Sequence, residues 1–365
     1  QWMIRCGTKD YGATGRGITR RAGDSSSAGY LAPVVRDMLM LGTGHDPEFR
    51  NILARLGGDS SAPLVGNRHF WRGDLMTHHR PGYYMSAKMV SNRIFNTDGP
   101  SNEEGLKSHH LSDGCTYIMR TGMEYHDIFP VWNWMKVPGT TVRITPSLEG
   151  GVRFKGTRAF AGGVSDGRYG CAAFDMERSG LIARKSWFFF DDEVVCLGAG
   201  IGCAKTDTVV TTLNQCFLRG DVNVSRMGKR TTVQKGSHGL DGVEWISHDG
   251  IVYLFPGHAN VRLSNMPQTG TWWDINHTHS KDAVTRDVFT LWLDHGMSPS
   301  NARYAYIIAP NLAPADVGKY HADPPVEILS NEPAIQAVRH KKLGITGIVF
   351  YEKGRVAVGN NLAVE

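Results

Sequence analysis

The clearest pattern along the chain is an aromatic run followed by acidic residues and a second apolar run, at Lys185–Ile201. Aromatic and β-branched residues suit a half-buried pleated surface, whereas Asp and Gly mark bends. The stretch therefore predicts two abutting strands. Similar short apolar runs bounded by Gly, Asn, Asp or Pro recur at 70–71, 83–90, 116–119, 141–144, 169–174, 208–213, 243–246, 251–255, 289–293 and 304–308.

Many strands at this spacing, with almost no helix between them, predict a mainly β protein with a large antiparallel β-sandwich over 63–322. A proline-marked connector then leads to a further β pattern over 326–365, which has too few strands to close a domain. Before the sandwich, apolar residues at helical spacing predict two helices within 28–56, joined by a glycine turn at 42–44. The Gly- and Ser-rich stretch 57–63 marks a domain boundary.

Composition narrows the function classes. The net charge of +5 over 365 residues is compatible with an anionic substrate, but the chain lacks the dense Lys/Arg blocks of a nucleic-acid binder. No apolar run reaches the roughly 18 residues of a membrane span. The six cysteines form no C-x-x-C pair, and three of them, Cys171, Cys196 and Cys216, lie in apolar strand-like runs where we expect buried free thiols.

Two polar segments are candidates for chemistry. Arg16 and Arg20 lie four apart in a Gly-containing loop, and guanidinium groups bind carboxylates and sulfates through paired hydrogen bonds. On spacing alone, a pair of solvated arginines that cap a helix is the favoured explanation. The polar turn 93–105 holds Asp98 and Asn102, which can present a carboxylate and an amide to a cleft, or simply belong to a hairpin connection.

Histidine and tryptophan pairs are weaker signals. Neighbouring residues in a strand point to opposite faces, so neither His78–His79 nor His109–His110 predicts a two-ligand metal site. We expect Trp272–Trp273 to be at most a weak platform for sugar rings, because strand tryptophans usually belong to the core.

Several motifs in consistent order resemble polysaccharide lyase family 8, which includes chondroitin AC, hyaluronate and xanthan lyases, and they resemble the chondroitin AC branch most. The similarity runs from about residue 10 to the C-terminus. The matching stretches are Gly15–Arg20, Phe70–Asp74, His79–Gly82, Asn102–Glu104, Leu111–Gly114, Phe129–Trp132, Val137–Thr140, Gly162–Gly170, Ser186–Ile201, Thr211–Gln215, Leu291–Gly296 and Ile335–Val338.

The resemblance implies an architecture and a reaction. Residues 1–57 are expected to end an α/α toroid, 63–322 to form a galactose-mutarotase-like supersandwich, and 326–365 to begin a small C-terminal β domain. The family cleaves uronic-acid polymers by β-elimination, using an Asn, a His and a Tyr on the toroid. Those three residues have no match here, so we expect the chain to be part of a longer protein and inactive alone.

Individual roles also follow from the resemblance. Arg16, Arg20 and Asp98 are predicted to take part in catalysis, and Asn102 and Arg93 to bind substrate. Asp98 stands where the chondroitin AC branch has a glutamate, which shortens the reach by one methylene. Some relatives bind calcium just after the Pro-Val-Trp motif, but Asn133, Met135 and Ile144 replace the acidic positions, so we expect no metal there.

We therefore predict part of a secreted or periplasmic lyase, monomeric and free of cofactors, that acts on an acidic polysaccharide, with chondroitin or hyaluronan first. Nucleic-acid and membrane partners are not expected. Two alternatives stay open: a lyase for another acidic polymer such as xanthan or alginate, and a β-sandwich that binds or supports a polysaccharide without cleaving it.

Overall fold

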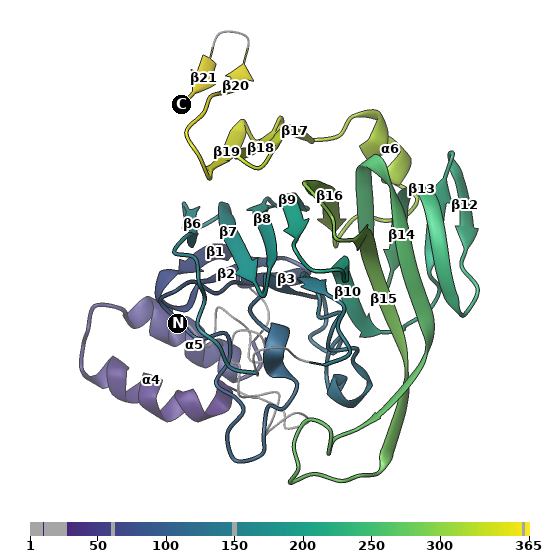
Figure 1. Ribbon diagram of the computed structural model, residues 1–365. Helices are drawn as coiled ribbons and strands as arrows, with labels where there is room; N and C mark the ends of the chain where they lie inside the picture. The colour runs from purple at the N-terminus through teal and green to yellow at the C-terminus, as the bar shows by residue number, and fades with distance from the viewer. Residues whose placement is uncertain (1–9, 11–27, 60–62, 148–151, 360–361) are drawn as a thin grey trace.

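The computed structural model describes residue 10 and residues 28–59, 63–147, 152–359 and 362–365 (Figure 1). Two antiparallel helices, α4 (Leu31–Met40) and α5 (Asp46–Leu56), follow the short 3-10 turn η1 (Ala28–Tyr30). Helix α5 begins at Asp46 and has Pro47 next to it, which suits the first turn of a helix. Asp46 and Glu48 in the first turn and Arg55 in the last complement the helix dipole. The predicted helix pair is confirmed.

Strands make up most of the remaining chain. The first sheet has the order β1-β2-β3-β4, and the second has twelve strands, with the path β12-β11-β13-β14-β16-β9-β8-β7-β6 and with β10, β15 and β5 attached. Their bounds are β1 Gly66–Phe70, β2 Leu75–Arg80, β3 Tyr83–Lys88, β4 Cys115–Met119, β5 Thr141–Arg143, β6 Ala161–Ser165, β7 Gly170–Arg178, β8 Leu181–Phe189, β9 Val194–Cys203, β10 Thr208–Phe217, β11 Asn223–Arg226, β12 Lys229–Thr232, β13 Ser237–His248, β14 Ile251–Thr271, β15 Ala283–Met297 and β16 Ala302–Ala309.

The predicted strand pair at 185–201 is confirmed as the β8–β9 hairpin, with Phe189 paired to Val194. Successive side chains of a strand point to opposite faces. Accordingly Trp187 and Phe189 join the core between the two large sheets, whereas Phe188 and Phe190 join a second core on the other face. The hairpin is buried on both sides because hydrophobic layers cover both of its faces.

The first core explains the sandwich architecture. It combines Met76 and Tyr117 of the four-stranded sheet with Phe174, Trp187 and Tyr306 of the twelve-stranded sheet. Cys171, Cys196 and Cys216 are free and buried, as expected. The prediction of a mainly β, antiparallel sandwich is therefore confirmed.

A smaller C-terminal unit covers the outer face of the large sheet, above β6–β9 in Figure 1. Helix α6 (Val317–Ala322) leads into the sheet β17-β18-β19 and the hairpin β20-β21, with bounds Val326–Asn331, Ile335–His340, Ile345–Phe350, Val356–Gly359 and Leu362–Val364. Val338 and Val349 pack into the second core, beside Phe188. At the same contact His340 Nε2 lies 2.8 Å from Glu193 Oε1.

One strand is much longer than its pattern predicts. Strand β14 spans 21 residues, whereas the apolar run covers only 251–255. The rest of the strand reads as a loop in the sequence because it contains Pro256, Gly257 and Pro267, which are unfavourable inside a strand. Pairing with β13 and β15 holds the strand over this length, so tertiary contacts override the local signal. No helix in the described ranges has the length and apolarity to cross a membrane.

Candidate functional site

The candidate residues Asp98 and Asn102 are exposed and lie on one turn, residues 97–105, within the long connection from β3 to β4. Backbone hydrogen bonds between Ser101 and Glu104 close the turn in both directions, at 3.2 and 3.0 Å. Asn102 and Glu103 adopt left-handed backbone angles, φ 52° and 61°, which asparagine tolerates better than most residues. The turn thus presents a carboxylate and an amide to solvent from a closed loop.

Asn96 fastens the base of this turn. Its side-chain nitrogen donates to the carbonyls of His109 and Val152, both at 2.9 Å, and its side-chain oxygen accepts from the N–H of Phe154 at 2.9 Å. The residue is 3% exposed. Three bonds of a buried amide hold the turn against two other segments. Nothing in the sequence pattern distinguishes Asn96 from an ordinary turn residue.

The connection from β14 to β15 supports the other side of the turn. Leu106 N–H donates to Ile275 O and His277 N–H donates to Glu103 O, both at 3.1 Å. Trp272 packs edge-on against Phe129 in the core.

The second tryptophan of the pair, Trp273, stacks on His277 at 4.4 Å between ring centres. Lys281 Nζ lies 4.1 Å from the centre of the same ring. Both tryptophans thus already have protein contacts. Their weak candidacy as a sugar platform stays a prediction.

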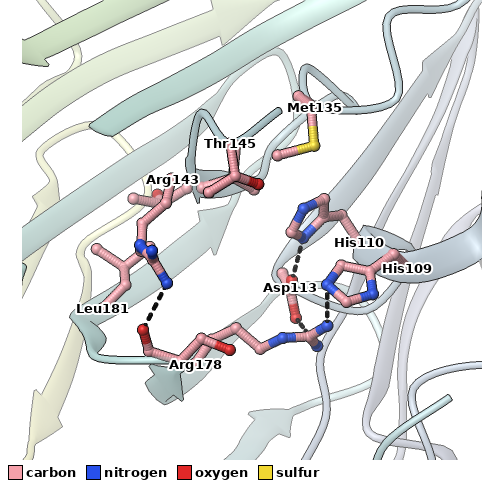
Figure 2. Close-up of a pocket in the computed structure, with 11 residues that line it drawn as sticks. His109, His110, Asp113, Met135, Arg143, Thr145, Arg178 and Leu181 are labelled. Carbon is pink, nitrogen blue, oxygen red and sulfur yellow. Dashed lines mark hydrogen bonds and ion pairs between the residues drawn. The ribbon is translucent and has the colours of Figure 1, made fainter. Parts of the chain in front are cut away.

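A cluster of buried charged groups follows the turn in the chain and includes His109, His110 and Asp113 (Figure 2). His110 Nδ1 donates to Asp113 Oδ2 at 2.7 Å, and Arg178 Nη1 lies 3.5 Å from Asp113 Oδ1. Arg178 also donates to His109 Nε2, and its guanidinium covers the ring of Phe154 at 3.1 Å. The assumption that His109 and His110 lie in a strand is wrong, because they occupy the 3-10 turn η3 (Ser108–His110).

The charge states in this cluster follow from its geometry. Burial disfavours the charged form of Asp113, but Arg178 and the hydrogen bond from His110 outweigh it and lower the pKa of the carboxyl. Lys185 is fully buried, and burial lowers its pKa to about 7. Its Nζ donates to Asp113 O at 3.2 Å and Gly139 O at 2.5 Å. Gly114 permits this approach, since an added Cβ would lie 2.6 Å from Nζ.

The cavity beside this cluster is too small for a sugar ring. Its volume is about 30 Å³, enough for a water-sized group. Two arginines, two histidines and one carboxylate line it, and that carboxylate is already paired. Such a lining disfavours a hard cation, which needs oxygen ligands.

The expected absence of calcium after the Pro-Val-Trp motif stays a prediction. Met135, one of the three residues on which it rests, lines this cavity. Among the described residues, no three His, Cys, Asp or Glu side chains gather as a metal site.

The other predicted site residues are placed differently. Arg93 Nη2 binds the buried carboxylate of Asp74, and its guanidinium also donates to the carbonyls of Ala159 and Ala161. These contacts tie the β3–β4 connection to β6, which gives Arg93 a structural role, and substrate binding by Arg93 stays a prediction. Arg16 and Arg20 lie outside the described residues.

Models of known protein families match nearly the whole of the described sandwich. A family model described as polysaccharide lyase family 8, super-sandwich domain, matches residues 65–321. A second model, described as the C-terminal beta-sandwich domain of the same family, matches residues 327–365.

Individual proteins of known activity are also similar to the chain. The chain is 39% identical over 362 residues to chondroitinase-AC of Pedobacter heparinus, covering 97% of this chain and 51% of that protein. It is 35% identical to xanthan lyase of a Bacillus species, covering 74% of this chain and 31% of that lyase. The chain thus spans about half the length, or less, of these curated relatives.

Solved structures agree with this picture. A chondroitinase AC lyase solved with oligosaccharides matches at a TM-score of 0.85 and 37% identity, over 96% of this chain and 52% of that one. A Streptomyces coelicolor chondroitin AC lyase in complex with chondroitin sulphate matches at 0.70 and 32% identity, over 83% and 41%.

Proposed function

The chain belongs to polysaccharide lyase family 8, and from this membership we propose that it is the sandwich portion of a lyase that cleaves a uronic-acid polysaccharide by β-elimination. The observation that carries the proposal is the turn 97–105. It presents Asp98 and Asn102 to solvent while Asn96 and two backbone bonds hold it in place. A fixed, exposed pair of polar groups is suited to orienting a substrate.

The chemistry requires a division of labour. Removing the proton beside a uronate carboxylate builds negative charge on that group, so donors or cations near the carboxylate lower the barrier. A base and an acid must also move protons at neighbouring carbons. We assign Asp98 to orienting these groups, Asn102 to binding the sugar, and Arg16 and Arg20 to the anionic substrate. The proton transfers themselves are assigned to toroid residues that this sequence does not contain.

The substrate class follows from the relatives. The relative at 39% identity is named for chondroitin, three relatives at 34%, 26% and 24% for hyaluronate, and one at 35% for xanthan. We therefore place chondroitin first, hyaluronan second and xanthan third. The net charge of +5 is compatible with each of these polyanions. We further propose that the whole protein is secreted or periplasmic and acts as a monomer without a cofactor.

The test follows the ultraviolet absorbance of the conjugated, unsaturated uronate product. Chondroitin sulfate, hyaluronan and xanthan are each mixed with this chain and with a longer product of the same gene that contains a toroid. We expect absorbance to rise with the longer protein on one or more polymers and to stay flat with this chain.

Variants of the longer protein test the role of the turn. Asp98→Asn is expected to lower kcat/KM about a hundredfold, because a positioning group is lost at the reacting sugar. The control is Glu327→Gln, which removes an exposed carboxylate from the C-terminal sheet. A folded longer protein that leaves all three polymers intact would overturn the lyase proposal. Equal losses of kcat/KM in both variants would show that Asp98 does not take part in the site.

A further inference from the structure

The hairpin β11–β12 is a concentrated basic surface outside the turn 97–105. It forms one edge of the twelve-stranded sheet, on the opposite side of the molecule from α4 and α5 (Figure 1). All four residues of β12 are exposed. The segment 222–240 contains Arg226, Lys229, Arg230 and Lys235 and no carboxylate.

Three of these cations have no acidic partner. Lys235 pairs with Asp287 at 2.6 Å, but within this fully described segment Arg226, Lys229 and Arg230 form no ion pair. Glu244 on the neighbouring strand β13 accepts hydrogen bonds from Ser225 Oγ and from Gly228 N–H. The hairpin tip is therefore braced, and it keeps an excess of positive charge.

Protection of a sheet edge explains only part of this arrangement. Charged residues on an edge strand prevent pairing with another chain, which accounts for Lys229 and Arg230 on β12. Arg226 lies on β11, which is paired on both sides, and it stands directly opposite Lys229. Like charges at directly opposite positions destabilise a hairpin. A bound anion removes this repulsion, whereas edge protection does not need it.

We propose that the β11–β12 hairpin is an auxiliary binding site for an acidic polysaccharide chain. This inference rests on the proposed function, which supplies the polyanion. Guanidinium groups bind carboxylates and sulfates through paired hydrogen bonds. Each exposed ion pair is weak by itself, but a long polymer that reaches both the hairpin and the turn 97–105 binds the second site at high effective concentration. A short oligosaccharide occupies one site only.

The test compares two triple variants of this chain with the same loss of charge. The first is R226Q/K229Q/R230Q. The control is K319Q/K341Q/K353Q, which changes three exposed lysines of the C-terminal part. Calorimetry at low ionic strength measures the affinity for long chondroitin sulfate and for a short chondroitin oligosaccharide.

We expect the hairpin variant to bind the polymer about tenfold more weakly, and the control to stay within about twofold of the wild type. The difference should vanish near 1 M salt, where the screening length falls to about 3 Å. Equal polymer affinity of hairpin variant and wild type overturns the inference. The same calorimetry with anionic phosphatidylserine vesicles tests for a lipid surface, and a loss of affinity confined to these vesicles also overturns the inference.

Binding and elimination are measured separately, so the two proposals fail separately. If the longer protein eliminates nothing but the hairpin variant still loses polymer binding, only the lyase proposal fails. If elimination occurs and the hairpin variant keeps its polymer affinity, only the auxiliary site fails. Melting temperatures of both variants confirm that they are folded.

Discussion

The β8–β9 hairpin and the turn 97–105 both contain acidic residues at a bend, yet the sandwich uses them in opposite ways. Trp187 and Phe188 on β8 are each about 1% exposed because separate cores cover the two faces of the hairpin. Asp98 and Asn102 are exposed, and buried groups hold only the base of their turn. The hairpin thus contributes mainly to the stability of the fold, whereas the turn presents polar groups to the solvent.

The largest expected effect comes from the core of the hairpin. Trp187→Ala should lower the free energy of unfolding by about 3–5 kcal/mol, because it removes a large buried side chain and leaves a cavity. Denaturant unfolding measures the change. Trp71→Ala is the control, since that ring is 60% exposed, and it should cost about 1 kcal/mol or less. Similar losses in the two variants would show that burial of Trp187 does not set its contribution to stability.

The second effect is a pH dependence of stability that arises from Lys185 on the same hairpin. Its pKa is about 7 when folded, against 10.5 for an ordinary lysine, because burial disfavours the charge. Between these values the unfolded chain binds the additional proton, so this group makes the fold more stable as pH rises from about 7 to about 9. The slope is about 1.4 kcal/mol per pH unit at most.

Unfolding curves for the wild type and K185M across this range measure the contribution. We expect the free energy of unfolding of the wild type, relative to that of the variant, to increase as the pH rises. Other titrating groups affect both proteins alike, so they cancel in the difference. Parallel curves would contradict a lowered pKa of Lys185 in the folded state.

The third effect is intermediate in size and concerns Asn96, which holds the base of the turn. Asn96→Ala should destabilise the fold by about 1–3 kcal/mol, because it leaves the N–H of Phe154 and two carbonyls without the buried amide. Hydrogen exchange should increase within 97–105 and stay constant in β8 and β9. The exposed neighbour Asn92 serves as control through Asn92→Ala. Unchanged exchange in the turn would show that other contacts hold it.

The smallest effect on stability is expected at the turn itself. Asp98→Asn should change the free energy of unfolding by about 0.5 kcal/mol or less, since the side chain is exposed. Thermal melting of the same preparation used for the activity assay measures it. A large loss of stability would mean that Asp98 mainly supports the fold, and the activity of this variant could then not be assigned to substrate positioning.

Local pattern predicted the elements that are buried in a regular way. The run 185–201 has enough aromatic and aliphatic residues to indicate two strands, and the spacing within 28–56 indicates two helices. The candidate turn was different, because Asp98 and Asn102 by themselves fit any polar connection. Their selection depended on the resemblance to a family, and the roles of Arg16, Arg20, Asp98, Asn102 and Arg93 stay predictions.

The sequence by itself determined the class of fold, the strand pair at its centre and the family, since these depend on short-range periodicity and on motif order. Only the tertiary structure decided that β14 extends over 21 residues, that Arg93 binds Asp74, and that Asn96 ties the turn to residues 109, 152 and 154. The physical reason is that these features depend on partners far away in the sequence. A hydrogen bond over 58 positions, such as that from Phe154 to Asn96, leaves no local periodic signal.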